Sequence, residues 1–174
     1  MKTFWNWSRL VCTAALLIGS VACGRENADE FVARGKAALE EKRPADAIIE
    51  FRRAIQTDPK HGEARLALAG TYAQTNDLGN ALREYVRAAD LLPEDNDTQL
   101  KAGSYLLLSR QFQDAQARAD GVLARDPGNV NAQILRGNAL AGLKDFKGAV
   151  ADYEAAIAAD PKNLSAYVSL GTIQ

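Results

Sequence analysis

Cysteine and histidine are the residues best suited to nucleophilic or metal chemistry, and this chain has few of them. It contains two cysteines, Cys12 and Cys23, and one histidine, His61. That is too few for a zinc site or a disulfide framework. We expect His61 to be a solvated link residue, and neighbouring Asp58 and Glu63 have no base or metal-ligand partner nearby. The sequence therefore predicts no catalytic residue, no cofactor and no metal.

Cys23 stands at the end of a short uncharged stretch that begins at Leu10, after Lys2 and Arg9. This stretch is too short to cross about 30 Å of hydrocarbon as a helix. A basic start, an apolar stretch and small residues at its end are typical of a secretory signal peptide, here residues 1–22. The alternative is an N-terminal membrane anchor.

The segment Gly19-Ser20-Val21-Ala22-Cys23-Gly24 resembles the lipobox of bacterial lipoproteins, although Ser20 stands where leucine is commoner. The resemblance implies that Cys23 is lipidated, with residues 23–27 as a short tether. A thiol is a good nucleophile near neutral pH, and several acyl chains anchor a protein stably. Gly24 implies sorting to the outer membrane, with the body facing the periplasm. The alternative is ordinary cleavage near Ala22 that leaves Cys23 free.

The body of the chain repeats every 34 residues. Four prolines are 34 apart, and three further columns of small or aromatic residues keep the same register. These are Pro59, Pro93, Pro127 and Pro161; Ala47, Ala81, Ala115 and Ala149; Gly35, Ala69, Gly103, Gly137 and Gly171; and Phe51, Tyr85, Ala119 and Tyr153. Such self-similarity is the signature of a stacked repeat architecture.

Each unit is expected to form two helices. In the second unit, apolar residues from Leu66 to Ala73 recur at three- and four-residue spacing, Asn76 and Asp77 form the turn, and a second stripe follows from Ala81. Pro93 then ends the second helix. Asp29, Glu63, Asp97 and Asn131 are expected near the first-helix starts, where they satisfy free N–H groups or the helix dipole.

These columns resemble the tetratricopeptide repeat. Its order of small, aromatic and proline positions is carried by Ala69, Tyr72, Ala81, Tyr85, Ala88 and Pro93. The resemblance implies an all-α fold, a right-handed superhelical solenoid of antiparallel helix pairs with units at 28–61, 62–95, 96–129 and 130–163. The early aromatic is replaced by Arg65, Gln99 and Gln133, and the third unit has Ala119 in place of a ring. The alternative is another helical-hairpin solenoid.

Residues 164–174 read as the first part of a fifth unit that stops in mid-helix. Solenoids normally end in a polar capping helix, and Val168, Leu170 and Ile173 are poorly suited to that role. We therefore expect the natural chain to continue. The alternative is that this half-helix is itself the cap.

The resemblance places a binding face on the first helix of each unit, and an extended peptide or an amphipathic helix would suit it. A protein or peptide partner would contact the apolar column of this face, with Leu107 beside it, and the polar column that flanks it. The alternative is that the apolar column is part of the core. The residues are Val32, Leu66, Leu100, Ile134 and Val168, and Lys36, Gly70, Ser104 and Asn138. The chaperone-tail clamp of some family members is not expected, because the matching columns are acidic or apolar and the only suitable groups are Lys36, Lys101 and Asn138.

The charge balance excludes other functions. Lys and Arg number 21 against 22 Asp and Glu, a formal net charge of −1, and no basic stripe of the kind that binds nucleic acid is evident. We predict a non-enzymatic, lipid-anchored scaffold or adaptor for protein interactions in the bacterial cell envelope. The resemblance fits assembly, pilus, secretion or exopolysaccharide machinery. The alternatives are the recruitment region of an enzyme whose catalytic domain lies beyond residue 174, and a soluble periplasmic peptide binder.

Overall fold

The computed structural model describes residues 27–173. Within that range the chain forms nine α-helices and no strand, joined by short turns. They are α1 (Ala28–Glu40), α2 (Pro44–Thr57), α3 (Gly62–Gln74), α4 (Leu78–Leu91), α5 (Asn96–Leu108), α6 (Phe112–Arg125), α7 (Val130–Gly142), α8 (Phe146–Ala159) and α9 (Leu164–Gly171). The predicted signal peptide and Cys23 lie outside the described residues.

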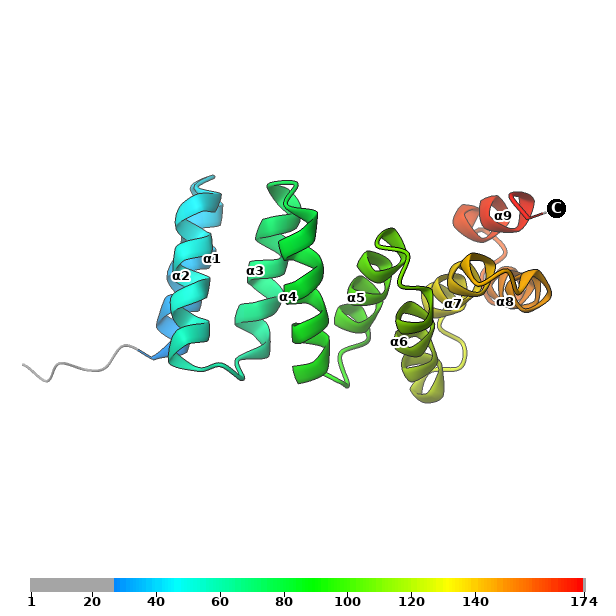
Figure 1. Ribbon diagram of the computed structural model, residues 1–174, viewed down its shortest axis with the longest axis horizontal. Helices are drawn as coiled ribbons and strands as arrows, with labels where there is room; N and C mark the ends of the chain where they lie inside the picture. The colour runs from blue at the N-terminus through cyan, green and yellow to red at the C-terminus, as the bar shows by residue number, and fades with distance from the viewer. Residues whose placement is uncertain (1–26, 174) are drawn as a thin grey trace, which may run out of the picture.

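The helices form one elongated row of antiparallel pairs, α1 with α2 through α7 with α8, followed by α9 (Figure 1). Each second helix also packs on the first helix of the next pair. Three of the four successive pairs of first helices also contact each other: α1 with α3, α5 with α7, and α7 with α9. In the described part of the chain no comparable contact joins successive second helices, so the row curves with its first helices inside. The predicted all-α solenoid is confirmed.

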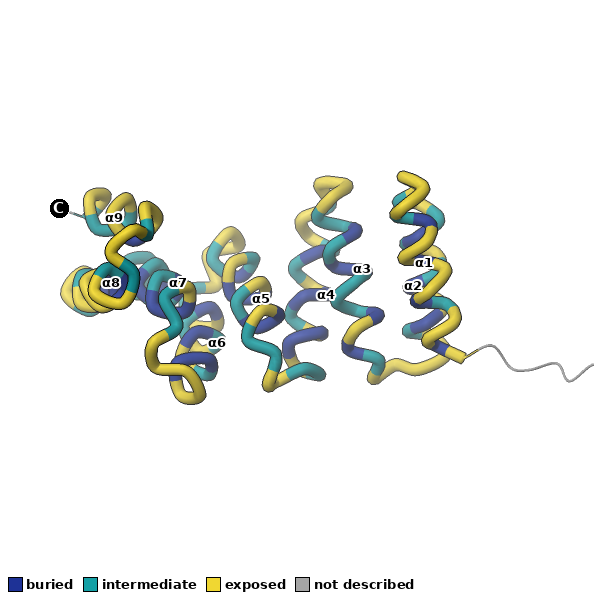
Figure 2. The backbone as a smooth tube through the Cα atoms, turned by 180° about the vertical axis from the view of Figure 1, so that it is seen from behind, coloured by how far each residue is buried: buried dark blue, intermediate teal, exposed yellow. Residues whose placement is uncertain are grey.

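Glycine allows the two helices of a pair to approach closely where an aromatic ring fills the gap. A methyl group added to Gly137 would lie 2.5 Å from Cε1 of Tyr153, and Phe51 covers Gly35 in the same way. Both rings are fully buried. Buried stretches alternate with exposed ones along the helices (Figure 2). In the third unit, where Ala119 replaces the ring, Leu135 of α7 lies against Gly103 instead. The next unit thus supplies the missing apolar group.

The turn inside every pair has the same backbone. Lys42, Asn76, Arg110 and Lys144 are 34 residues apart, and each has a positive φ between 58° and 67°. The next N–H donates back to a carbonyl in the first helix, as from Gln111 to Leu106 at 2.9 Å. This closes the helix end, but the left-handed conformation is unfavourable for a residue with a side chain.

Glycine at Lys42, Arg110 or Lys144 is therefore expected to stabilise the fold. Each substitution should raise the free energy of unfolding by roughly 0.5 kcal/mol, because the relief of strain exceeds the added freedom of the unfolded chain. Asn76→Gly should have a smaller effect, since asparagine tolerates this conformation. Urea titration measures the changes. Lys101→Gly, on an exposed helical site, is the control and should destabilise by about 1 kcal/mol; a loss of stability at Lys42 as well would contradict the prediction.

The N-caps of the first helices lie two residues earlier than the acidic positions that the sequence indicated. Side-chain caps come from Asn27, His61, Asp95, Asn129 and Asn163, while Asp29, Glu63 and Asp97 occupy the first turns. The expectation of a solvated His61 was wrong. Its side chain is only 14% exposed, Nδ1 accepts the Ala64 N–H at 3.2 Å, and Nε2 lies 3.0 Å from Asp29 Oδ1. His61 is a cap that connects the first two units.

The three polar residues at the early aromatic position bind the carbonyl groups that precede them. Arg65 donates to the Pro59 carbonyl at 3.0 Å, Gln99 to the Ala89 carbonyl at 2.6 Å, and Gln133 to the Pro127 carbonyl at 3.1 Å. Each side chain thus satisfies acceptors at or after the end of the preceding second helix. This departure from the repeat pattern replaces ring packing with hydrogen bonds between units.

Candidate functional site

One groove lies on the inner face of the row, between α5 and α7. It has a volume of about 520 Å³, and its apolar lining comes from Leu100 and Leu107 on α5 and from Ile134 and Leu135 on α7. Polar groups surround this lining: Asp97, Lys101, Ser104, Tyr105, Asn131, Asn138 and Ser165. Because α5 and α7 are first helices of successive units, the same positions of the two units face each other across the groove.

Five of the predicted binding residues come together in this groove. They are Leu100, Ser104, Leu107, Ile134 and Asn138. Ser104 is exposed, and the other four are half-buried. The apolar side chains are thus accessible in part, which is what a docking groove requires and a sealed core does not.

The predicted residues at the two ends of the row lie elsewhere. Val32 is buried at 6% exposure in a cluster with Ala64 and Leu68 of α3, so it packs in the core and does not line the α5–α7 groove. Leu66 packs on the core around Tyr85, and Gly70 is half-buried beside it. Lys36 is exposed on α1, and Val168 is 66% exposed on α9. The apolar column is therefore core at its start and surface at its end.

Asn138 is oriented from the core of its own helix pair. The hydroxyl of Tyr153 donates to Asn138 Oδ1 at 2.8 Å. This fixes the amide so that its N–H groups are the ones that can donate to a ligand carbonyl. Burial and the nearby negative charge of Asp152 raise the pKa of Tyr153, against the opposing effect of a hydrogen bond with Ser169, so the donor stays protonated near neutral pH.

Tyr105 and Leu135 belong to the groove but were missed by sequence reasoning. Tyr105 stacks on Tyr85 of α4, with ring centroids 4.7 Å apart and planes inclined by 31°. The equivalent positions in the other units are Ala37, Thr71 and Ala139. A tyrosine in a column of small residues was the available signal. Leu135 gave none, because only the stacked fold shows that it replaces a ring of the unit before it.

Buried Tyr85, which stacks on Tyr105, makes stability sensitive to alkaline pH. Burial, with a smaller contribution from Tyr105, raises the pKa of Tyr85 above its usual value of about 10. Tyr85 therefore ionises at a lower pH in the unfolded chain than in the folded chain. The stability that neutral Tyr85 contributes is fully present below about pH 10 and is lost as the pH rises through its pKa in the folded state. Tyr85→Phe should reduce the loss of stability seen by urea titration above about pH 10. Tyr167→Phe, on the exposed ring, is the control and should leave the loss unchanged.

The groove offers recognition chemistry. One carboxylate, Asp97, and one ammonium, Lys101, give its lining no net charge, and its hydroxyl and amide groups can bond a peptide backbone. Among residues 27–173, no group of three or more His, Cys, Asp or Glu side chains is placed to hold a metal ion. No helix in the same range is long and apolar enough to cross a bilayer.

Comparison with known proteins identifies the repeats. Two family profiles, both described as tetratricopeptide repeat, match residues 38–102 and 100–163. An uncharacterized protein of Haemophilus influenzae is 32% identical over 78 residues, which are 45% of this chain and 44% of that protein. This chain therefore spans less than half the length of that relative.

Solved structures share the fold at low sequence identity. MamA residues 41 to the end, from Desulfovibrio magneticus, superimposes with a TM-score of 0.72 at 19% identity, covering 84% of this chain and 82% of that one. YrrB is described as a tetratricopeptide repeat protein with an unusual peptide-binding site. It superimposes with a TM-score of 0.72 at 20% identity, covering 82% of this chain and 73% of YrrB.

Proposed function

Because the chain is a tetratricopeptide repeat protein over residues 38–163, we propose that it is a non-enzymatic scaffold that binds a segment of a partner protein in the α5–α7 groove. This fold is generally a scaffold for protein interaction. The observation that carries the proposal is the accessible apolar lining of Leu100, Leu107 and Ile134 between two helices that each pack against neighbouring helices. A preformed groove binds at little cost in conformational entropy.

The chemistry of the groove defines the partner. A lining without net charge suits an extended peptide or an amphipathic helix that buries apolar side chains against Leu100 and Ile134. Asn138, oriented by Tyr153, donates to a backbone or side-chain carbonyl of that segment. A segment with several charges of one sign would find only one opposite charge in the lining, Asp97 or Lys101, and its other charges would lose hydration without a partner.

We further propose that the scaffold is lipid-anchored through Cys23 in the bacterial cell envelope, on the outer membrane facing the periplasm. Support comes from the sequence alone: the basic start, the apolar stretch and the resemblance of Gly19–Gly24 to a lipobox. A tether would raise the local concentration of the groove near membrane-bound partners.

In-cell photo-crosslinking tests the groove. A photoreactive amino acid at exposed Ser104 should give partner adducts, and Leu107→Arg in the same chain should abolish them. Exposed Glu154 on α8 is the control position and should give none. Equal adducts from Ser104 and Glu154, or adducts that persist with Leu107→Arg, would overturn the proposal that the partner binds in the groove.

Mass spectrometry of the mature N-terminus tests the anchor separately, since an unmodified terminus rules out the lipid.

A further inference from the structure

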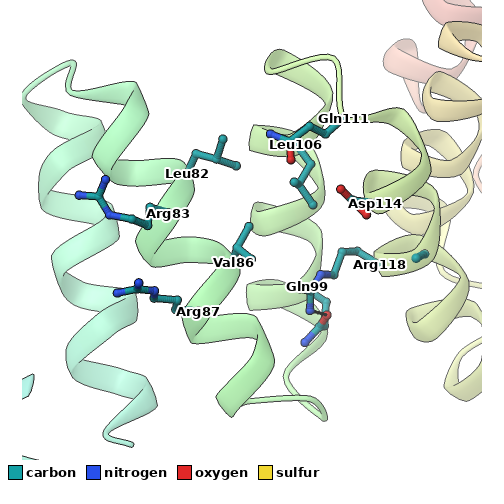
Figure 3. A pocket seen from close by; sticks show the side chains of 10 residues that line it. Leu82, Arg83, Val86, Arg87, Gln99, Leu106, Gln111, Asp114 and Arg118 are labelled. Carbon is teal, nitrogen blue, oxygen red and sulfur yellow. Dashed lines mark hydrogen bonds between the residues drawn. The ribbon is translucent and has the colours of Figure 1, made fainter. Parts of the chain in front are cut away.

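A second groove lies among α4, α5 and α6, and it is lined by two second helices, α4 and α6, together with Gln99 and Leu106 of the first helix α5 (Figure 3). Its volume is about 610 Å³. Leu82 and Val86 extend from α4 toward Leu106 of α5. The first two are half-buried and Leu106 is 4% exposed, so the groove has an apolar base that solvent reaches from one side.

Short side chains keep this groove open. Leu106 and Ala117 belong to the third unit, and 34 residues earlier the equivalent positions hold Tyr72 and Arg83. Both of these larger side chains line the equivalent groove between α2 and α4, which is mostly polar. Apolar space is therefore open between α4 and α6 but not one unit earlier.

The ridge of α4 between the two grooves carries excess positive charge. Arg83 and Arg87 line both grooves, and their side chains are 55% and 56% exposed. The nearest carboxylate, Glu84, is committed to Arg65 at 2.9 Å and lies 3.7 Å and 3.9 Å from the other two arginines. One buried carboxylate thus faces three guanidinium groups.

The far rim carries a third cation at a fixed place. Arg118 of α6 bonds Asp90 of α4 at 2.6 Å and Gln99 at 3.3 Å. The groove lining as a whole has three arginines and one carboxylate, Asp114. This positive lining belongs to a chain whose formal net charge is −1.

We infer that this groove is a second docking surface, for an acidic segment of a partner protein that carries a bulky apolar side chain. The apolar side chain packs on Leu82, Val86 and Leu106, and flanking carboxylates pair with Arg83 and Arg87. Charge complementarity selects this occupant, because Arg83 and Arg87 share one distant carboxylate, Glu84, and a basic or neutral segment would add no further negative charge beside them. The inference is independent of the α5–α7 groove, whose lining has no net charge, and it gives the scaffold two surfaces for two partners.

Fluorescence anisotropy on the full chain tests this surface with a labelled synthetic peptide in which phenylalanine and leucine alternate with glutamate. The Arg83→Glu, Arg87→Glu double variant should weaken binding at least about tenfold. Lys147→Glu with Lys162→Glu, which changes the net charge equally at exposed sites, is the control and should change binding less than about twofold. Ala117→Trp should weaken binding too, because it fills the groove from an exposed position without touching a charge.

Three outcomes would overturn the proposal. Equal losses in the two charge-reversed variants would show non-specific attraction, and full binding by Ala117→Trp would show that the apolar groove is unused. Saturable binding of phosphatidylglycerol vesicles through Arg83 and Arg87, without peptide binding, would reassign the surface to lipid. Leu107→Arg in the α5–α7 groove should leave peptide binding intact, so failure of either site is distinguishable from failure of the other.

Discussion

Replacement of Tyr153 by alanine is expected to lower the free energy of unfolding by about 3–5 kcal/mol. The ring is 1% exposed and fills the space left by Gly137, so its removal leaves a cavity between α7 and α8. The two helices cannot move together to fill this cavity, because neighbouring helices hold their backbones in place. Urea titration followed by circular dichroism measures the loss, and hydrogen exchange should locate it in α7 and α8.

The matched variant Tyr153→Phe separates the ring from its hydroxyl. It keeps the packing and removes the hydrogen bond to Asn138, so we expect a loss of only about 1 kcal/mol. It should also weaken partner binding in the α5–α7 groove, because the amide of Asn138 is no longer oriented. If Tyr153→Phe destabilised the fold as much as Tyr153→Ala, packing against Gly137 would not be the cause.

Replacement of Arg136 by methionine is expected to cost about 3 kcal/mol. Arg136 forms a two-pronged ion pair with Asp152, at 2.8 Å and 2.6 Å, and reaches Asp120 at 3.2 Å, so one side chain joins α6, α7 and α8. These hydrogen bonds, chiefly that with Asp152, raise the pKa of Arg136, although its partial burial opposes them. Without Arg136, Asp152 stays buried, at 9% side-chain exposure, and is left unpaired.

Arg53→Met is the control for this prediction. Arg53 pairs with Glu50 at 2.8 Å, but the arginine is 54% exposed, so the pair contributes less than about 1 kcal/mol. A further variant, Arg136→Met with Asp152→Leu, should recover most of the lost stability, because it removes the unpaired carboxylate. The prediction fails if the double variant is no more stable than Arg136→Met in the same urea titration.

The helix pairs could be predicted because their signals are local and repeated. The columns of Ala47 and Pro59 recur four times, and each has a steric meaning that does not depend on neighbours. The expected place of the acidic residues at the first-helix starts is confirmed, but the N-cap residues themselves were not identified. Asp29, Glu63 and Asp97 are acidic residues of first turns, and a turn and a cap attract the same residue types. A histidine cap such as His61 could be recognised only from its bond to Ala64.

The binding groove could be predicted only in part, because equivalent positions have unequal surroundings. Val32, Leu100 and Val168 share one column, yet they are buried, half-buried and exposed in turn. Their exposure depends on which helices pack on either side. The α4–α6 groove had no sequence signal for a similar reason: it depends on the sizes of side chains from three helices that the column alignment treats separately.

The ion pair between Arg118 and Asp90 limits how the pairs can be ordered. In the other three units the position of Arg118 holds an acidic residue: Glu50, Glu84 and Asp152. The position of Asp90 holds Gln56, Ala124 and Ala158 elsewhere. Only the second unit therefore has a carboxylate at the position that pairs with Arg118 of the third unit. Chains of near-identical hairpins are prone to misassembly by stacking on the wrong neighbour or on another copy. A reversed charge at one junction destabilises stacking on the wrong neighbour. The order of the hairpins is therefore set by electrostatic interactions as well as by the covalent chain.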